Sequence, residues 1–243
     1  LSLRRQRQMC IRDSAYLMGS FLGQVTQEGI LSVKLELDGK ASNLLDVPLM
    51  ASALVGILEP SSAAVNNISS ASIASSRGIN LSTIKHERRC DYETLLKITI
   101  KHDNGERTIT GTLIAGNKPR IINIQGISIE SEFPKCALYL RNYDKPGFIG
   151  DLGNKLGKQN INIASFHLGR RNTGGEARKF ENIPTASKPQ QEQLGKRNQF
   201  ISKFVSENIK SPELADAAKQ NYTTPVSYTH LRAHETEADL VCR

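Results

Sequence analysis

The segment from Arg141 to Gly169 constrains the fold of this chain more than any other part of its sequence. Ala137 to Leu140, just before the segment, is typical of a short apolar strand, and Ile161, Ile163, Ser165 and the following residues resume a strand pattern further on. The apolar side chains between them recur at the spacing of one helical face, at Ile149, Leu152 and Leu156. The pattern predicts a strand, a glycine-rich turn, a helix and a second strand.

The glycine-rich turn predicts a place where a small molecule can bind. Pro146 stands where a first helical turn tolerates a missing N–H. Gly147 and Gly150 lack a Cβ, so a ligand can approach the backbone closely. The N–H groups at a helix N-terminus, together with the helix dipole, favour an anionic group.

Several motifs in this chain stand in the order and spacing of one protein family. The turn reads Asp144-x-Pro-Gly-x-x-Gly and is followed by Asn-Ile-Asn-Ile-Ala-Ser; the blocks before it are Gly19-Ser-Phe-Leu-Gly-Gln-Val, Arg77-Gly-Ile and Ala115-Gly-Asn-Lys-Pro-Arg-Ile-Ile-Asn-Ile-Gln-Gly. Residues 15–177 thereby resemble the C-terminal regulatory region of the D-3-phosphoglycerate dehydrogenase family. The resemblance implies an α+β chain. An intervening, or allosteric-substrate-binding, α/β domain would span 24–132, and a partial ferredoxin-like (βαββαβ) ACT domain would span 135–177.

The resemblance also implies an effector site for L-serine or a similar amino acid at the interface of two ACT domains, and so a homo-oligomer. Its residues would be Asn142, Asp144, Pro146, Gly147, Phe148, Ile149, Gly150 and Asn162. The chemistry fits, because Asp144 can accept a charge-assisted hydrogen bond from an ammonium group and the Asn162 amide can both donate and accept. From the residues alone, Asp144 could equally be a helix cap.

Lys118 and Arg120 form a second candidate, an anion site for a phosphorylated ligand, since both side chains bind phosphate well. The alternative is that the two are simply solvated basic residues. The resemblance implies that the family's intervening domain binds substrate or a similar anion, but for these two residues we favour the solvated interpretation.

Other segments of the sequence predict the elements of the intervening domain. Residues 15–23 look like the end of a truncated helix, and Pro48 to Leu58 reads as a buried helix that begins at the proline. Two alternating strands flank the Asp103 to Gly105 turn, and a further strand pair from Pro119 to Ile129 bends at Gly126.

The tail and both ends depart from the family pattern. The third ACT strand lies between the first and second, yet Ala177 to Ile183 lacks the alternation of a central strand, so the sheet is expected to stay incomplete. We expect 178–225 to be mostly helical or disordered and of chimeric origin. Residues 1–14 and 226–243 resemble translated sequencing adaptors and are expected to be artefacts; adaptor-free DNA at both ends would overturn this.

The resemblance implies feedback sensing rather than catalysis by this chain. The parent enzyme oxidises 3-phosphoglycerate with NAD, but the sequence shows no Gly-x-Gly-x-x-Gly loop, and we expect no catalytic residue, cofactor or metal site in it. The whole chain has a net charge of +8, but residues 15–177 contain 18 basic and 15 acidic groups. This near balance argues against a nucleic-acid partner. No apolar run reaches membrane-spanning length, and a cytoplasmic location is expected.

Two other interpretations stay open at this point. One is a β-domain and ACT fragment of an L-serine dehydratase, which has a related layout. The other is a free-standing amino-acid-binding or RNA-binding ferredoxin-like protein, for which Phe166 would be the one aromatic candidate on the sheet face.

Overall fold

The computed structural model describes residues 2–26, 29–62, 64–86, 91–114, 118–134, 136–143, 147–158, 162–170, 176–182 and 236–242. The chain divides into two compact units, Leu1–Phe133 and Pro134–Arg243. Both contain helices and strands, which confirms the α+β class.

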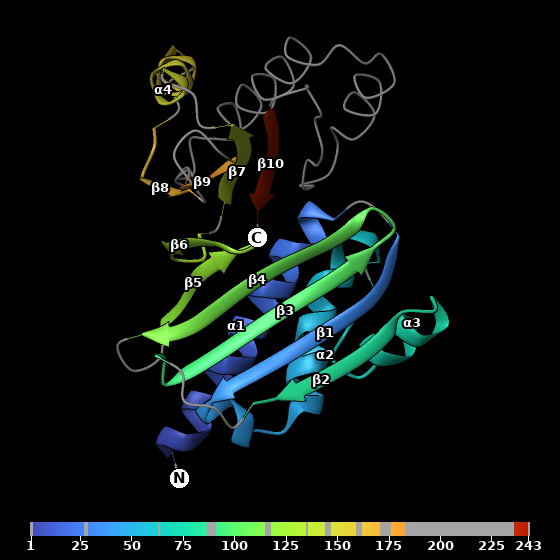
Figure 1. The fold of residues 1–243 in the computed structure, drawn as a ribbon. Coiled ribbons are helices and arrows are strands. Elements are labelled where there is room, and N and C mark those ends of the chain that lie inside the picture. Colours follow the sequence, from blue (N-terminus) through green and yellow to red (C-terminus); the bar gives the residue numbers. More distant parts are fainter. Residues whose placement is uncertain are drawn as a thin grey trace, which may run out of the picture. The chain divides into compact units, whose positions relative to one another are not determined.

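The first unit is built on a mixed six-stranded sheet (Figure 1). Its strands are β1 (Ile30–Gly39), β2 (Asn80–Lys85), β3 (Thr94–His102), β4 (Gly105–Ile114), β5 (Lys118–Ile124) and β6 (Ile127–Ser131). Their order across the sheet is β2-β1-β3-β4-β5-β6. β1 and β2 run parallel, whereas every other neighbouring pair is antiparallel. β2 is therefore one edge of the sheet.

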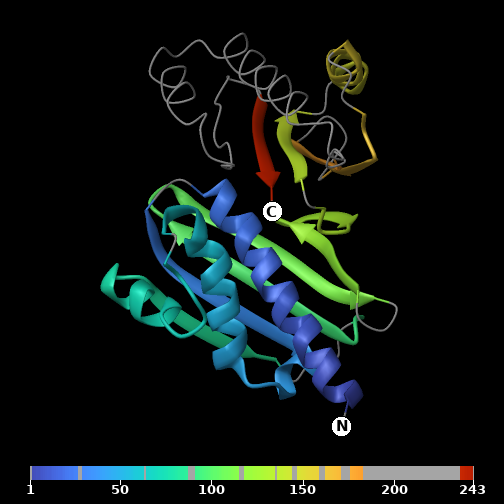
Figure 2. The same cartoon turned by 180° about the vertical axis from the view of Figure 1, so that it is seen from behind.

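Two helices cover one face of this sheet, α1 (Ser2–Val25) and α2 (Asp46–Leu58) (Figure 2). The shorter α3 (Ser70–Ser76) precedes β2, and 3-10 turns lie at Lys40–Asn43 and Glu59–Ser61. Alternation along the strands produces the core, because successive side chains point to opposite faces. On β1, for example, Val33, Leu35 and Leu37 are buried, while Lys34 and Glu36 lie on the opposite face.

The two long helices touch through their backbones, at glycines. A Cβ built on Gly19 would lie 2.2 Å from the carbonyl oxygen of Ala53, and one on Gly23 would lie 2.4 Å from that of Ile57. In the other direction, a Cβ on Gly56 of α2 would lie 2.3 Å from the carbonyl oxygen of Tyr16. A side chain at any of these positions would hold the helices apart, so the glycines set the depth of the contact.

Two helix boundaries differ from those predicted. α2 begins at Asp46 rather than Pro48, because a proline is tolerated within the first turn. The helix expected over 15–23 continues back to Ser2 without a break, and Ile11 and Ser14 are buried. Segments rich in arginine, glutamine and methionine have good helix propensity, so they can extend a helix whatever their origin. The adaptor origin of 1–14 stays a prediction.

The predicted turns of the sheet are confirmed. β3 and β4 are joined at Asp103 and Asn104, with Gly105 at a φ of 140°. β5 and β6 are joined by Gln125 and Gly126, with φ values of 51° and 79°. Positive φ at both central residues is the geometry of a type I′ hairpin, for which Asn-Gly is the favoured pair. Gln125 therefore holds a left-handed conformation that suits it poorly.

We expect Gln125→Asn to raise the free energy of unfolding of the first unit by about 0.5 kcal/mol, because asparagine tolerates this φ better. Gln125→Val should lower it by about 1 kcal/mol or more, since a β-branched side chain is strongly disfavoured there. Urea denaturation of the three proteins checks the order. A valine variant as stable as the parent would contradict it.

The second unit contains a four-stranded sheet and one helix. In chain order these are β7 (Cys136–Tyr143), α4 (Phe148–Lys158), β8 (Ser165–Arg170), β9 (Glu176–Asn182) and β10 (Thr236–Cys242). The order across the sheet is β10-β7-β9-β8, so the third strand of the unit lies between its first and second. The strand, helix and strand predicted around the glycine-rich turn are confirmed.

The prediction of an incomplete sheet was wrong at its central position. β9 pairs antiparallel with both β7 and β8, although its residues do not alternate between apolar and polar. Unpaired backbone groups between β7 and β8 would be costly, so pairing outweighs the side-chain pattern. β10 lies within the adaptor-like segment 226–243, and residues 183–235, including most of the tail expected to be helical or disordered, fall outside the described residues.

Candidate functional site

The turn before α4 is shaped by Gly147. This residue has a φ of 89°, which favours glycine, and its carbonyl oxygen accepts a 3.0 Å hydrogen bond from the N–H of Asp151. Among the described atoms, a Cβ built on Gly147 or Gly150 would meet nothing within 4 Å. Glycine at 147 is thus explained by its conformation, and the described residues leave space beside the first helical turn.

The charges of α4 agree with its dipole. Asp151 lies in the first turn, while Lys155 and Lys158 lie in the last. The first N–H groups of a helix have no acceptor within the helix itself. The N-terminal end of α4 therefore has the polarity on which the predicted anion site depends, and the site itself stays a prediction.

The predicted apolar face of α4 is only partly buried. Leu152 and Leu156 pack into the core of the unit, whereas Ile149 keeps 47% of its surface exposed. The interior of this unit thus covers the helix from its second turn onward. Ile149, together with the half-exposed Phe148, leaves an apolar surface beside the glycine turn.

The strand register separates the two asparagines of the predicted site. Asn142 on β7 pairs with Ala177, which also pairs with Arg170 at the far end of β8. Ser165, where β8 begins, pairs with Asn182, which lies opposite Ala137. Asn142 and the start of β8 are thus five residues apart along the sheet, about 17 Å at strand spacing.

Asn162 is exposed and lies three residues before β8, at the opposite end of the sheet from the glycine turn. The fold of one chain brings together the turn residues Gly147 to Gly150 and the end of β7 at Asn142. It does not bring Asn162 to them. Asp144 and Pro146 lie outside the described residues. A site that uses both the turn and Asn162 therefore needs two copies of the chain.

The second predicted site is altered by an ion pair. Lys118 and Arg120 share one face of β5, and Lys118 is exposed. The Arg120 guanidinium, however, lies 2.8 Å from a carboxylate oxygen of Glu132. An anion at this position would have to compete with Glu132, and among the described residues only Lys118 supplies a positive charge of the pair that no carboxylate holds.

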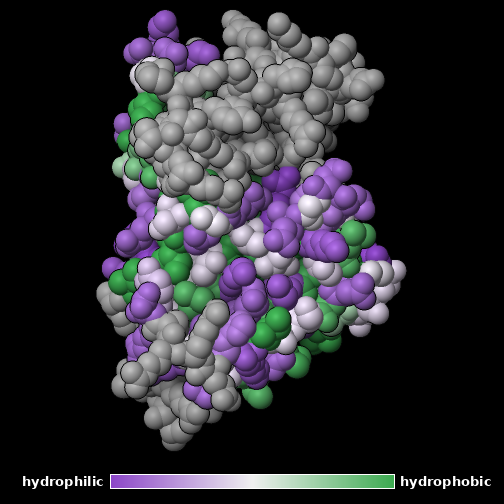
Figure 3. Space-filling view, viewed as in Figure 1, coloured by the Kyte–Doolittle hydropathy of each residue, from purple (hydrophilic) through white to green (hydrophobic). Residues whose placement is uncertain are grey.

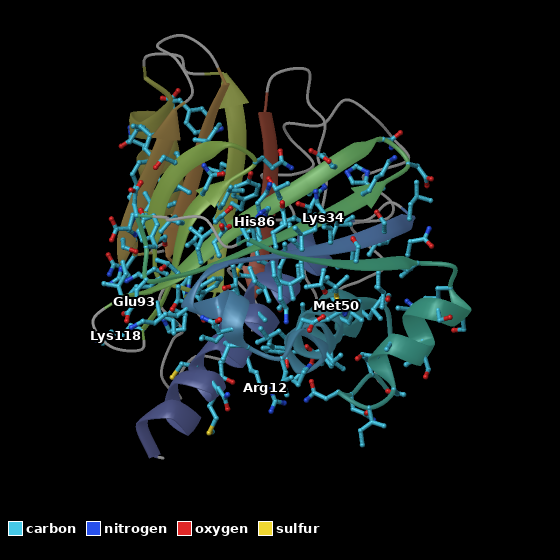
Figure 4. All side chains as sticks on the ribbon, turned by 60° about the horizontal axis from the view of Figure 1, so that its bottom comes forward. Arg12, Lys34, Met50, His86, Glu93 and Lys118 are labelled. Atoms are coloured by element: carbon cyan, nitrogen blue, oxygen red, sulfur yellow. The ribbon has the colours of Figure 1, made fainter. Side chains whose placement is uncertain are left out.

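A cluster around Glu36 on the open face of the sheet was missed by the sequence reasoning. A Glu36 carboxylate oxygen lies 2.8 Å from Lys97 Nζ and 3.8 Å from Lys34 Nζ, and His86 Nε2 lies 3.6 Å from the other oxygen. Figure 4 labels Lys34 and His86 near one another over this face. The signal available in the sequence was the two-residue spacing of Lys34 and Glu36 on one strand, but their partners are Lys97 on β3 and His86, the residue after β2.

The surroundings of Glu36 change its acidity. Partial burial by itself would raise the pKa of the carboxyl, but the hydrogen bond and charge of Lys97, with Lys34 and His86, bring the pKa below its ordinary 4.5. A folded-state pKa below the unfolded value stabilises the fold at neutral pH. That stabilisation is lost as the pH falls from about 4.5 through the folded-state pKa.

We expect Glu36→Gln to flatten the loss of stability of the first unit between neutral pH and the acid range, because the variant has no carboxylate to protonate. The free energy of unfolding, measured by urea at a series of pH values, should converge for the two proteins at low pH. The exposed pair Lys85 and Asp46 supplies the control, since Asp46→Asn should leave the contribution of Glu36 unchanged. Parallel curves for parent and Glu36→Gln would contradict the assignment.

One surface hollow of about 360 Å³ lies elsewhere on the first unit. It is lined by Met9, Arg12, Asp13, Tyr16, Ser52, Val55 and Asn67. Three of these belong to the adaptor-like segment 1–14, so the hollow adds no candidate to the family-like part of the chain. Across the described residues, no group of three or more His, Cys, Asp or Glu could hold a metal ion, and no helix is long and apolar enough to cross a bilayer.

Comparison with known proteins connects the first unit to one family. Residues 13–125 match the family model described as the D-3-phosphoglycerate dehydrogenase intervening domain. The D-3-phosphoglycerate dehydrogenase of Bacillus subtilis (strain 168) is 29% identical over 161 residues, which cover 66% of this chain and 31% of that protein. That of Methanocaldococcus jannaschii is 32% identical over 167 residues, or 67% and 31%.

A second kind of relative has a related sequence. The probable L-serine dehydratase beta chain of Bacillus subtilis is 28% identical over 102 residues, which cover 42% of this chain and 46% of that protein. The matched part of this chain spans about 30% of the length of the dehydrogenases. Their activity as whole proteins is therefore not carried over to it directly.

Proposed function

We propose that this chain, whose residues 13–125 match the intervening domain of D-3-phosphoglycerate dehydrogenase, is a regulatory part of such an enzyme that senses L-serine through its second unit. The matches to whole dehydrogenases cover two thirds of the chain, more than the intervening domain alone. The residues that follow that domain therefore take part in the likeness.

One observation supports the proposal most directly, namely the topology of the second unit. Its third strand, β9, lies between its first and second, β7 and β8, as these three strands do in an ACT domain. β10 lies in the adaptor-like segment 226–243 and does not count toward this support. The glycine turn joins the first strand to its helix, where N–H donors and the helix dipole favour a carboxylate.

The proposed site assigns one role to each group. The carboxylate of an amino acid would accept hydrogen bonds from the N–H groups at the start of α4, and Asp144 would accept from its ammonium group. Asn162 would come from the second copy, because the register places it at the far end of the sheet in its own chain. Serine would thereby join two chains and shift the parent enzyme toward a state that binds it better.

The parent activity, oxidation of 3-phosphoglycerate with NAD, belongs to the proposal and not to any described residue. Residues Lys118 and Arg120 remain a proposed anion site in the intervening domain, with Glu132 as its internal competitor. A cytoplasmic location stays a prediction.

Isothermal titration calorimetry of the full chain with L-serine tests the proposal. We expect one serine per chain in the dimer, an increase of the dimer fraction in sedimentation, and no heat with D-serine. Gly147→Val should abolish the heat, because valine cannot adopt a φ of 89° without strain. A folded chain that gives no heat with L-serine at millimolar concentration would contradict the proposal.

An L-serine dehydratase remains the second candidate, and its support is the similarity to the beta chain of that enzyme. The coding sequence adjoining this region discriminates between the two, since a dinucleotide-binding Gly-x-Gly-x-x-Gly region favours the dehydrogenase and a set of iron–sulfur cysteines favours the dehydratase. For the RNA-binding alternative, the sheet-face candidate Phe166 is half-buried, which weakens it.

A further inference from the structure

β2 leaves one side of its backbone unpaired among the described strands. It is the outermost strand of the six-stranded sheet and bonds only to β1, in parallel register from Ser32–Asn80 to Leu37–Lys85. Every second N–H and C=O group of such an edge points away from the sheet. An edge of this kind can pair with another strand.

The usual protections of an edge strand are absent from β2. Its sequence, Asn-Leu-Ser-Thr-Ile-Lys, contains no proline, and its register with β1 has no bulge. Its one charged residue, Lys85, is at the end, and the ammonium group is held 2.9 Å from the carbonyl oxygen of Leu44 and 3.1 Å from the Asp46 carboxylate. This charge is too far from the middle of the strand to prevent another strand from pairing there.

Apolar side chains surround the same edge. Leu81 and Ile84 on β2 are 37% and 40% exposed, on opposite faces of the strand. Leu45 and Val47 are 77% and 75% exposed and flank Asp46. Because Asp46 is paired with Lys85, these two side chains lie beside the C-terminal end of β2. Figure 3 shows hydrophobic surface along the rim where Figure 1 draws β2 and α3. Clustered exposed apolar residues of this kind mark an interaction site.

We propose that β2 pairs antiparallel with β2 of a second copy of this chain, around a two-fold axis at Ser82. This register sets Leu81 opposite Thr83 and Asn80 opposite Ile84. Side chains that lie directly opposite each other then point to the same face of the combined sheet. Such an isologous contact matches each free donor of one copy with an acceptor of the other.

Charge favours the second copy as the occupant. Within the paired stretch from Asn80 to Ile84 every residue is uncharged, and Lys85 remains outside it with its own Asp46. No like charges therefore face each other across the axis. A six-residue edge buries less than the roughly 800 Å² per partner of a stable interface, so the pairing is weak and depends on concentration.

Sedimentation velocity of the full chain over a range of concentrations tests this pairing. The double variant Leu81→Lys/Ile84→Lys should lose one association step, because lysines on an edge block strand pairing. Ile149→Lys supplies a background in which association through the second unit is weakened, because Ile149 belongs to the site proposed where two second units meet. Parent and edge variant are compared both with and without Ile149→Lys, so any association through the second unit cancels.

A cysteine at the axis provides the second readout. With the four native cysteines replaced by serine, Ser82→Cys should form an intermolecular disulfide on mild oxidation, since residues directly opposite in an antiparallel pair have Cβ atoms about 5 Å apart. Asn80→Cys should not form this disulfide, because the two copies of residue 80 lie several residues apart along the paired strands. Identical sedimentation of parent and edge variant in both backgrounds, or no preference for cysteine at 82 over 80, would overturn the proposal.

Discussion

Replacing Gly56 by alanine should destabilise the first unit by about 3 kcal/mol or more. The added Cβ would lie 2.3 Å from the Tyr16 carbonyl oxygen and 2.4 Å from the Ser20 amide nitrogen. Both atoms belong to the backbone of α1, which cannot turn aside as a flexible side chain can. The helices must move apart, and the contacts between them and with the sheet beneath are lost. Gly23→Ala should act in the same way, against Ile57.

Gly153→Ala in α4 is the matched control. It makes the same chemical change in a helix interior, but its Cβ would meet nothing within 4 Å among the described atoms. Alanine there should stabilise its own unit by about 0.5–1 kcal/mol, because glycine costs more chain entropy on folding. Hydrogen exchange resolved by peptide follows each unit separately. Unchanged protection of α2 in Gly56→Ala would show that the helices are not in backbone contact.

Two variants that each fail to bind serine should recover binding when they are mixed. Gly147→Val disables the turn, and Asn162→Ala removes the amide that the register places at the far end of the sheet. If each site takes its turn from one copy and its asparagine from the other, the mixed dimer contains one intact site. The second site in that dimer carries both defects.

The stoichiometry makes this prediction quantitative. Equal amounts of the two variants form half of their dimers as mixed pairs when exchange is random, so about one quarter of the parent's sites should return. Calorimetry with L-serine before and after mixing measures this fraction, and Gly147→Val mixed with Gly147→Ala is the control that should recover nothing. Binding restored to neither mixture, with both single variants folded, would mean that the turn and Asn162 of one site come from the same chain. Binding retained by Asn162→Ala alone would place Asn162 outside the site.

Much of the candidate site could be predicted from local sequence, and some of these predictions agree with the structure while others do not. The turn and helix around Gly147 followed from glycine, proline and the apolar spacing, and the structure confirms them. Ile149 was assigned to the same helical face as Leu152 and Leu156 but is exposed while they are buried, because periodicity identifies a face but not how much of it the rest of the unit covers. The ion pair of Arg120 with Glu132 joins residues twelve apart, which no strand or helix period connects.

The α+β class, the hairpin turns and the strand, turn and helix of the candidate site could all be predicted without the structure, because these depend on φ preferences and on periods of two and 3.6 residues within one segment. Three results required the folded chain: Glu176–Asn182 is a central strand, Asn162 lies away from the turn, and α1 and α2 meet at Gly19, Gly23 and Gly56. Each of these results depends on which backbone groups remain to be paired or packed once distant segments come together.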